Sequence, residues 1–384
     1  MEHLLLTGVT GNIGSHLLYE LLIERSIAVK RNPSLNGIIY ILIRPTKKLT
    51  AKQRLWKEVL HPNLIPDKIE KEHLNIAKTQ IQVIEGDIHH FDLPTEAGNQ
   101  LIVYHLAASV NLGTDTKARE EISSINYKET KSFLEKIKTF TKKLIFVSTA
   151  FSRGDTTGII TDDYHSIKEF DFRNPYEEFK MKMEKEVCLL ANQYNFEYTI
   201  VRPSIVSGRL LDTPKYITKT YTVFYNIGAF FKKIKKLNPD IGKIRIALNP
   251  KAGLNIIAVD YVAKALLKAG KSKEKQINLT STKNVPISHI VRTILEKCEI
   301  NDFEFTANEP NNKSTIEHLF YKTVGHQLLR YSISKVHEFE SKIIRELLKD
   351  IKEPDMIFEF SKLYEFAHEI GFDNQNIKTT FQKI

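Results

Sequence analysis

Cysteine and long apolar runs are both scarce in this chain of 384 residues. The two cysteines, Cys188 and Cys298, stand far apart and match no metal-ligand spacing, so we expect no metal site and a reducing, cytoplasmic location. No apolar stretch is long enough to cross a bilayer. The first apolar strand begins by His3, which leaves no room for a secretory signal, and none is expected.

Acidic residues are outnumbered, and the formal net charge is +10. This excess favours an acidic partner. The basic residues are spread over the chain, with no zinc-finger spacing, RNP-type strand or basic-zipper repeat, so nucleic acid is not the expected partner. Three explanations account for the charge equally well: binding of phosphorylated small molecules, binding of an acidic protein that carries them, or a solvated lysine-rich surface. The oligomeric state is left open.

The apolar content of 42% supports a sizeable core, built from short apolar runs that alternate with amphipathic stretches. This order is typical of an α/β fold, a doubly wound parallel sheet of the Rossmann type, whose ligand crevice lies at the carboxyl ends of the strands. The predicted strands span residues 3–6, 38–43, 81–85, 101–105, 144–147 and 198–201, and the predicted helices between them include 13–23, 120–138 and 176–194.

The texture of the sequence changes after Gly208. We predict a nucleotide-binding domain with the catalytic residues over 1–208, and a smaller, mainly helical substrate-binding region over 209–384. Within the second region, residues 254–270 return to a strand-then-helix pattern and are expected to rejoin the Rossmann core. Three helices are predicted near the carboxyl terminus, at residues 315–329, 334–349 and 355–370.

Three glycines, Gly8, Gly11 and Gly14, follow the first strand and open an apolar helical pattern. Glycines there make a tight turn with bare amides at a helix start, which is where a dinucleotide diphosphate binds. The second strand ends in Arg44 instead of the acid that binds a ribose 2′-hydroxyl, and Arg54 follows. A guanidinium suits a 2′-phosphate, so NADPH is the predicted cofactor and NADH is disfavoured.

The pattern Y-x-x-x-K, which sets a phenol and an ammonium one helical turn apart, occurs four times. The pairs are Tyr127 with Lys131, Tyr164 with Lys168, Tyr176 with Lys180, and Tyr331 with Lys335. Only the third follows an expected helix start, with Asn174 as N-cap and Pro175 as first residue, and comes after a buried strand that ends in Ser148 and Thr149. We therefore select Tyr176 and Lys180 and interpret the other three tyrosines as surface residues.

Several motifs occur in the order found in one enzyme superfamily: "TGVTGNIG", "GDI" at 86–88, "HLAASVN" at 105–111, "FVSTAF", "YEEFK" and "VRPSIVSG" at 201–208. By these motifs the chain resembles the extended short-chain dehydrogenase/reductases over residues 3 to about 300. "LIRP", "AKQRL", "VSTAF" and "NIIAVDYVA" are similar to the branch that holds thioester reductase domains, the terminal domains of carboxylic acid reductases, and fatty acyl-CoA reductases (male sterility-like).

The resemblance implies a role for each motif. Tyr176 would donate a proton to the reacting oxygen, Lys180 would lower the pKa of that phenol and bind the nicotinamide ribose, and Thr149 would hydrogen-bond the same oxygen, with Ser148 as the fallback. Asp87 would contact adenine, and Pro203 and Ser204 would shape the nicotinamide pocket. The remaining residues expected at the cofactor are Thr7, Gly8, Thr10, Gly11, Asn12, Ile13, Gly14, Arg44, Arg54, Ile88, Leu106, Ala107, Ala108 and Asn126.

The implied reaction is reduction of an acyl thioester, of coenzyme A or of a carrier protein's phosphopantetheine, to the aldehyde, with further reduction to the alcohol left open. Residues 221–237 would line an acyl tunnel, although an amphipathic helix with a wet lysine face is the favoured interpretation. An enzyme for secondary alcohols, ketones or nucleotide sugars is the alternative, with Arg202, Arg209 and Arg245 as candidate ligands of a second diphosphate. A non-catalytic NADP-binding regulator is the third, and disfavoured, possibility.

Overall fold

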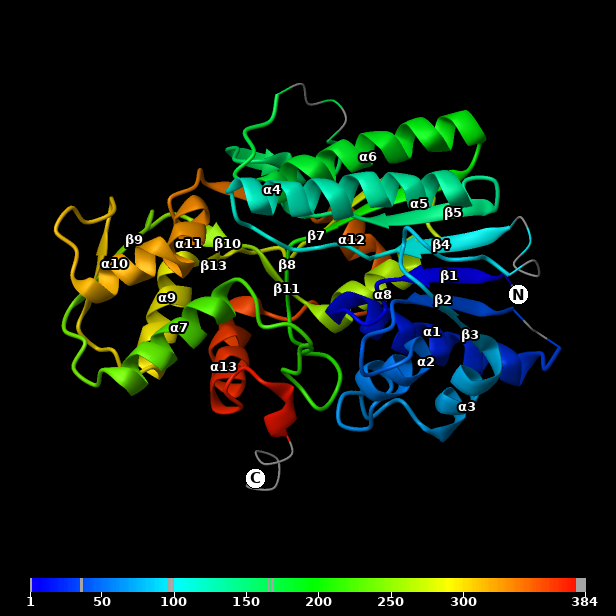
Figure 1. The fold of residues 1–384 in the computed structure, drawn as a ribbon, viewed down its shortest axis with the longest axis horizontal. Coiled ribbons are helices and arrows are strands. Elements are labelled where there is room, and N and C mark those ends of the chain that lie inside the picture. Colours follow the sequence, from blue (N-terminus) through cyan, green and yellow to red (C-terminus); the bar gives the residue numbers. More distant parts are fainter. Residues whose placement is uncertain are drawn as a thin grey trace.

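The computed structural model describes residues 2–34, 37–94, 98, 100–164, 166 and 169–377 (Figure 1). Seven parallel strands form the main sheet, in the spatial order β12-β7-β5-β4-β1-β2-β3. These strands are β1 (Leu4–Thr7), β2 (Ile39–Ile43), β3 (Ile81–Glu85), β4 (Leu101–His105), β5 (Thr141–Val147), β7 (Glu197–Pro203) and β12 (Gln276–Leu279). In the sheet, β2 and β3 lie on one side of β1, and β4, β5, β7 and β12 lie on the other side. A doubly wound sheet is confirmed, with its switch point between β1 and β4.

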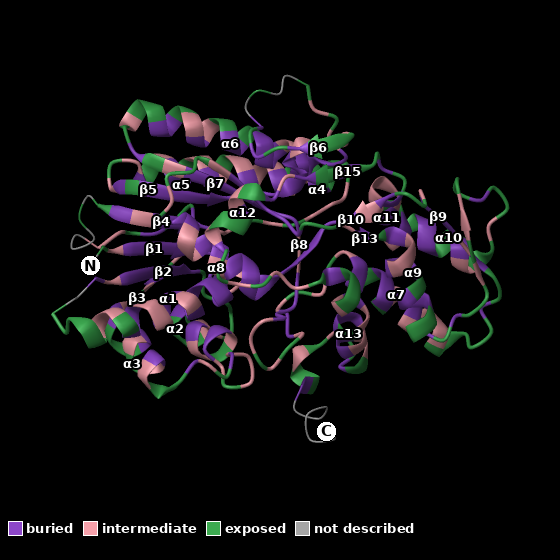
Figure 2. Ribbon diagram, turned by 180° about the vertical axis from the view of Figure 1, so that it is seen from behind, coloured by how far each residue is buried: buried purple, intermediate pink, exposed green. Residues whose placement is uncertain are grey.

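Helices cover both faces of this sheet. One face packs against α1 (Asn12–Arg31), α3 (Lys71–Gln80) and α8 (Val259–Ala269), and the other against α5 (Thr130–Ile137) and α6 (Pro175–Tyr194). Alternate residues of β1 divide between the two sides, since Leu4 and Leu6 belong to the first apolar cluster and Leu5 to the second. The strands are accordingly buried, while the outer faces of α3 and α6 are exposed (Figure 2).

Several elements differ in length from their predictions. The helix predicted over 13–23 continues to Arg31 as α1. The helix predicted over 120–138 consists of α4 (Thr116–Ile122), a π-helical stretch (Ser123–Glu129) and α5. Short helix α2 (Ala51–Arg54) and a further π-helical turn (Leu55–Val59) follow β2. The predicted strands all appear, with ends that shift by a few residues.

The second half of the chain contributes to the main sheet and also forms a helical lobe beside its carboxyl-terminal edge (Figure 1). β12 is the edge strand next to β7, and α8 packs against α1. The lobe contains α7 (Phe224–Leu237), α9 (Ile287–Lys297), α10 (Thr315–Lys322), α11 (Val324–Ser332) and α13 (Met356–Glu369), whereas α12 (Lys342–Leu347) packs against β12 and α8. Paired short strands join these parts: β8 (Ile205–Ser207) with β11 (Ile256–Ala258), β9 (Ile244–Ala247) with β14 (Phe303–Thr306), β10 (Gly253–Leu254) with β13 (Val285–Pro286), and β6 (Gly158–Ile160) with β15 (His337–Phe339).

Two of the predicted carboxyl-terminal helices are wrong in part. Residues 315–329 form two helices, because the backbone at Thr323 leaves the helical region (φ −117°, ψ −108°). The helix predicted over 334–349 is replaced by strand β15 and the short helix α12. The strand forms there because residues 337–339 pair with 158–160, a partner far away in sequence. The third helix is confirmed as α13, with Asp355 as its N-cap.

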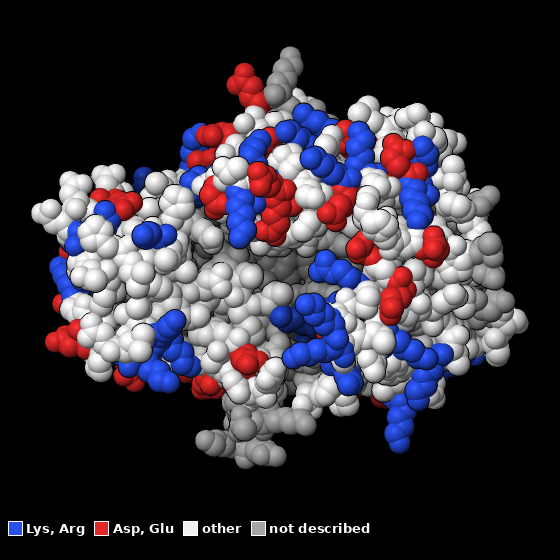
Figure 3. All heavy atoms as spheres, viewed as in Figure 1, with Lys and Arg blue, Asp and Glu red and all other residues white. Residues whose placement is uncertain are grey.

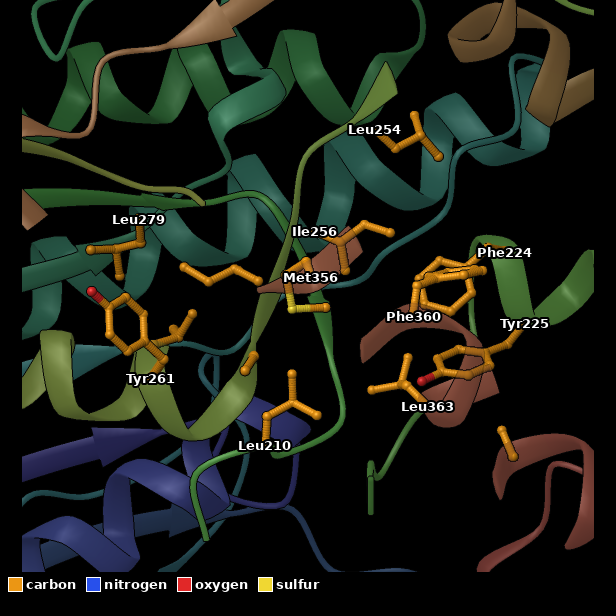
Figure 4. Close-up of a cluster of buried hydrophobic side chains, with 14 of the residues drawn as sticks. Leu210, Phe224, Tyr225, Leu254, Ile256, Tyr261, Leu279, Met356, Phe360 and Leu363 are labelled. Atoms are coloured by element: carbon orange, nitrogen blue, oxygen red, sulfur yellow. The ribbon is translucent and has the colours of Figure 1, made fainter. Parts of the chain in front are cut away.

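An apolar cluster connects the lobe to the sheet (Figure 4). Phe224 of α7 lies edge-on to Phe360 of α13, with ring centroids 5.1 Å apart. Met356 and Leu363, also of α13, are buried in the same cluster. Packing of this kind fixes the start of α7, which lies at the wall of the candidate site.

Candidate active site

A cavity of about 300 Å³ opens at the carboxyl ends of β1, β4, β5 and β7, where the switch point lies. It is lined by residues predicted for cofactor and catalysis: Gly8, Gly11, Asn12, Ile13, Gly14, Leu106, Ala108, Ser148, Thr149, Tyr176, Lys180, Pro203 and Ser204. Figure 3 shows the molecule hollowed near the middle of the same face, with Lys and Arg side chains gathered beside the hollow. The tertiary structure thus brings together motifs that are up to two hundred residues apart.

The glycine turn is shaped for close approach. Gly8 has φ +71°, and a Cβ atom there would lie 2.6 Å from the Ala107 nitrogen. A Cβ on Gly14 would lie 2.3 Å from the Gly8 carbonyl oxygen. Gly11 is the N-cap of α1, and no side chain caps this helix. Bare amides and the positive end of the helix dipole therefore face the cavity, which is the arrangement that binds a diphosphate.

The first turn of α6 presents the predicted phenol and ammonium. The Asn174 side chain accepts a hydrogen bond from the Glu177 amide at 3.1 Å, and Pro175 is the first helical residue, so the predicted cap is confirmed. The Tyr176 hydroxyl lines the cavity and has no hydrogen-bond partner among the described residues. Lys180 Nζ donates to the Val147 carbonyl at 2.9 Å.

The pKa values in this turn differ from the sequence argument. Burial, with the Glu177 carboxylate, raises the pKa of Tyr176 above its usual value. Burial lowers the pKa of Lys180 to about 8, against an opposing effect of Glu184. Lys180 is not among the groups that shift the pKa of Tyr176 here, so its effect on the phenol stays a prediction. Enclosure of the phenol dominates, and the ammonium is bound to a carbonyl oxygen of β5.

The two hydroxyl residues that follow β5 have different partners. Ser148 Oγ donates to the buried carboxylate of Glu184. Thr149 Oγ1 accepts a hydrogen bond from the Phe151 amide at 3.3 Å, which leaves its proton free to donate. Both residues line the cavity. Thr149 is therefore the better placed donor to a substrate oxygen, in keeping with its selection over Ser148.

Behind these hydroxyls lies a buried ion pair that the sequence analysis missed. Glu184 and Arg202 are both completely buried, and their N–O distance is 2.6 Å. Ser152 Oγ also donates to Glu184, at 2.9 Å, and the Arg202 guanidinium lies 3.7 Å from the centre of the Tyr164 ring. Glu184 comes one helical turn after Lys180, so its spacing was a possible signal. The pair anchors the hydroxyl segment to α6.

The interpretation of Tyr164 and Tyr331 as surface residues is wrong. Tyr164 is 1% exposed, because its ring packs under Arg202 and its hydroxyl donates to the Ala150 carbonyl at 3.0 Å. Tyr331 lines the cavity. Tyr127 is half-buried and donates to Glu186 at 2.9 Å. Lys168, the predicted partner of Tyr164, lies outside the described residues.

Tyr331 belongs to a polar network at the start of α6. Its hydroxyl accepts from Asn174 Nδ2 at 2.8 Å and donates to Glu177 Oε1 at 3.0 Å. Arg173 Nε donates to the same carboxylate oxygen at 2.9 Å, and the Arg173 guanidinium lies 4.6 Å from the Tyr331 ring centre. Burial raises the pKa of Glu177, while Arg173 and the Tyr331 hydroxyl act to lower it. Helix α11 thus supports the residues on either side of Tyr176.

The remaining predicted cofactor residues do not line this cavity: Thr7, Thr10, Arg44, Arg54, Asp87, Ile88, Ala107 and Asn126. Thr7 is completely buried, and its hydroxyl bonds to His105 Nδ1 at 3.0 Å, so its side chain joins β1 to β4. Asn126 clamps the backbone of Ser109 through two hydrogen bonds of 2.8 Å. These two side chains shape the wall of the cavity from behind.

The charged members of that group follow the ends of β2 and β3. Arg44 is exposed. Arg54 donates to the Arg44 carbonyl at 2.7 Å and pairs with Glu58 at 2.8 Å, so its guanidinium already has partners. Asp87 accepts from the His89 and His90 amides. Of these two arginines, Arg54 is ion-paired and Arg44 is exposed.

One part of the cavity wall is apolar. It consists of Val110, Leu112, Phe151, Val223, Phe224 and Tyr225. Three of these come from the start of α7, whose other face carries Lys232, Lys233, Lys235 and Lys236. The predicted amphipathic helix is present, and its amino-terminal turn also lines the cavity. A small apolar or aliphatic group would fit against this wall.

Sequence comparison matches residues 6–266 to the family described as Male sterility protein, an NAD-binding family. The chain belongs to this family. It is an extended short-chain dehydrogenase/reductase and an NAD(P)-dependent enzyme. No curated protein sequence matches the chain.

Solved structures with the same fold support the assignment of the architecture. The terminal R domain from the myxalamid PKS-NRPS biosynthetic pathway is 18% identical with a TM-score of 0.66, over 96% of this chain and 91% of that one. UDP-glucuronic acid 4-epimerase from Bacillus cereus, in complex with NAD, is 17% identical with a TM-score of 0.57, over 96% and 97%. UDP-N-acetylglucosamine 4-epimerase from Methanobrevibacter ruminantium M1 is 16% identical with a TM-score of 0.59, over 100% and 99%. At these identities the likeness concerns the fold.

In the described part of the chain, no helix is long and apolar enough to pass through a bilayer. Among the same residues, no group of three or more His, Cys, Asp and Glu side chains could hold a metal ion.

Proposed function

We propose that the protein is an NADPH-dependent reductase that converts an acyl thioester to its aldehyde. The observation that carries the proposal is the apolar wall of the cavity, which includes Val110 and Phe224 and lines the same space as Tyr176 and Thr149. An acyl chain could lie against it with its carbonyl beside the two hydroxyls. The substrate would be a thioester of coenzyme A or of a carrier protein.

The arginines that a nucleotide sugar would need lie outside the cavity. Arg202 is paired with Glu184, and Arg245 with Glu317 at 2.7 Å on a different strand pair. Arg209 is completely buried; its Nε donates to the Pro214 carbonyl, and its Nη1 and Nη2 have no hydrogen-bond partner among the described residues. None of the three lines the cavity. This arrangement disfavours a second diphosphate and hence an epimerase or dehydratase.

The cavity fits a dinucleotide. The glycine turn has no room for a Cβ at Gly8 or Gly14, α1 starts without a side-chain cap, and Ser204 Oγ is buried without a partner among the described residues. The absence of an acid at the end of β2, where Arg44 is exposed, favours NADPH over NADH. When bound, NADPH supplies the hydride.

Side chains of the protein would donate the proton and stabilise the negative charge that develops on the carbonyl oxygen. Tyr176 would give its proton to the carbonyl oxygen, and the Thr149 hydroxyl would donate a hydrogen bond to the same oxygen. Lys180 would leave the Val147 carbonyl to hold a ribose hydroxyl and to stabilise the phenolate. The thiohemiacetal then returns its hydroxyl proton to Tyr176 as the carbon–sulfur bond breaks, and the thiolate leaves and is protonated by water.

The test is to mix the purified protein with NADPH and separate panels of acyl-CoAs, acylated carrier proteins, ketones and UDP-sugars. We expect NADPH oxidation with thioesters alone, one free thiol per NADPH, and an aldehyde product. Tyr176→Phe should lower kcat by about 10²- to 10⁴-fold, whereas Tyr127→Phe, at a Y-x-x-x-K tyrosine that does not line the cavity, should not. Oxidation with ketones alone would reject the proposal. Cofactor binding without turnover on any panel would favour a regulator.

A further inference from the structure

A second cavity, of about 470 Å³, lies beside the first. It is lined by Gly113–Asp115, Asn226, Lys322–Val324, His326 and Gln327. These residues come from the segment after β4, from α7, and from the junction of α10 and α11. Nothing in the sequence analysis pointed to this place, because its residues carry no motif and come together only in the fold.

The two cavities share their dividing walls. The segment after β4 turns Val110 and Leu112 to the first cavity and Gly113 and Thr114 to the second. Helix α7 lines the first with Phe224 and Tyr225 and the second with the next residue, Asn226. Helix α11 contributes Val324, His326 and Gln327 to the second and Tyr331 to the first. A molecule that extends past these segments would have one end at Tyr176 and the other in the second cavity.

The second cavity differs from the first in its chemistry. Its side chains are mostly hydrogen-bonding groups, whereas the acyl wall is apolar. Lys322 is exposed at its edge. Arg330 lies directly behind, with Nη2 3.1 Å from both Thr114 Oγ1 and His326 Nε2. Because a guanidinium can only donate, His326 Nε2 is the acceptor, which leaves Nδ1–H as a donor.

The acidic side chain at this cavity is already engaged. Asp115 is the N-cap of α4 and accepts from the Ala118 amide at 2.9 Å. The other polar residues that line the cavity include Lys322, Asn226, His326 and Gln327, and each of these side chains can donate hydrogen bonds. Amide groups and a phosphate would satisfy such a set.

We propose that the second cavity binds the phosphorylated, amide-containing arm of the thiol that carries the acyl group, with Lys322 against the phosphate. This inference rests on the proposed function, since it assumes a thioester at Tyr176. The arm is the same in coenzyme A and in the phosphopantetheine of a carrier protein. The apolar acyl group would occupy the first cavity and contact its apolar side chains. The polar arm would occupy the second cavity and contact its hydrogen-bonding side chains.

The experiment compares thioesters of one acyl group on N-acetylcysteamine, pantetheine, 4′-phosphopantetheine, coenzyme A and a carrier protein. For the unmodified protein we expect KM to fall about tenfold from pantetheine to 4′-phosphopantetheine, as one charge-assisted contact forms. Equal KM values for these two would overturn the proposal without any variant. A further fall in KM for either the coenzyme A or the carrier-protein thioester would identify the natural source of the arm.

Lys322→Glu should raise KM for the phosphorylated thioesters about tenfold or more, with kcat and the KM for the N-acetylcysteamine thioester unchanged. Lys349→Glu, at an exposed lysine outside both cavities, is the matched control and should change neither value. An equal effect of Lys322→Glu on all thioesters, or no effect, contradicts the proposal. If none of these thioesters supports NADPH oxidation by the unmodified protein, the proposed function fails instead.

Discussion

Replacing Tyr331 with phenylalanine removes one hydroxyl from the network at the start of α6 and leaves the ring in place. Two hydrogen bonds are lost, the one donated to Glu177 Oε1 at 3.0 Å and the one accepted from Asn174 Nδ2 at 2.8 Å. Glu177 is completely buried and keeps Arg173 as a partner. A hydrogen bond to a charged group contributes about 1.5–3 kcal/mol, so we expect the free energy of unfolding to fall by about 2 kcal/mol.

The loss should depend on pH. Burial raises the folded-state pKa of Glu177, so the native protein binds the proton more tightly than the unfolded chain. Stability from this group is therefore greatest at acid pH and decreases as pH rises through the folded pKa. The Tyr331 hydroxyl lowers that pKa by favouring the carboxylate. Without this hydroxyl, the loss of stability with rising pH is larger. The difference in the free energy of unfolding between Tyr331→Phe and the unmodified protein should therefore be smaller at pH 5 than at pH 8.

Urea unfolding at both pH values measures this difference, and steady-state kinetics give the effect on the site. We expect kcat to fall about tenfold because Tyr176 lies between the two residues that lose a bond, with a smaller change in the KM for NADPH. Tyr127→Phe is the control, since its half-buried hydroxyl also donates to a carboxylate, Glu186. If Tyr331→Phe lowers stability no more than the control and leaves kcat unchanged, α11 does not support the catalytic turn.

Three further predictions concern the cofactor side of the cavity. Gly14→Ala would place a Cβ 2.3 Å from the Gly8 carbonyl oxygen, and we expect about 1–3 kcal/mol of lost stability together with weaker dinucleotide binding in a fluorescence titration. Arg44→Ala should weaken NADPH binding about 10- to 100-fold and leave NADH binding unchanged; an unchanged preference would refute the 2′-phosphate argument. Because burial lowers the pKa of Lys180 to about 8, kcat/KM should decline above pH 8 as the ammonium is lost, and Lys180→Arg should move that decline to higher pH.

Local sequence patterns were sufficient for the parts of the site that are formed by neighbouring residues. The turn from Thr7 to Gly14 was predictable because positive φ, close backbone approach and an uncapped helix start are properties of a few consecutive residues. The start of α6 was predictable for the same reason, since Asn174 caps and Pro175 begins a helix whatever surrounds it. The order of short apolar runs likewise indicated the parallel sheet.

Patterns that depend on distant partners could not be predicted in this way. Residues 337–339 have no strong local preference for a strand, and they form one because 158–160 offer a free edge. Tyr331 has the same local pattern as Tyr176, and only the packing of α11 against α6 brings its hydroxyl between Asn174 and Glu177. The partners of Ser148 and Thr149 also required the structure, because Glu184 and Arg202 meet the hydroxyl segment from α6 and β7.

The sequence by itself therefore determined the family, the nucleotide turn and the phenol–ammonium pair, since each is encoded within a dozen residues of backbone preference and side-chain type. The tertiary structure decided which groups enclose that pair: the apolar wall that includes the start of α7, the support from α11 and the second, polar cavity beside the segment after β4. Those groups come from chain segments that are far apart in the sequence and pack around a shared apolar cluster, and such packing has no local signal in the sequence.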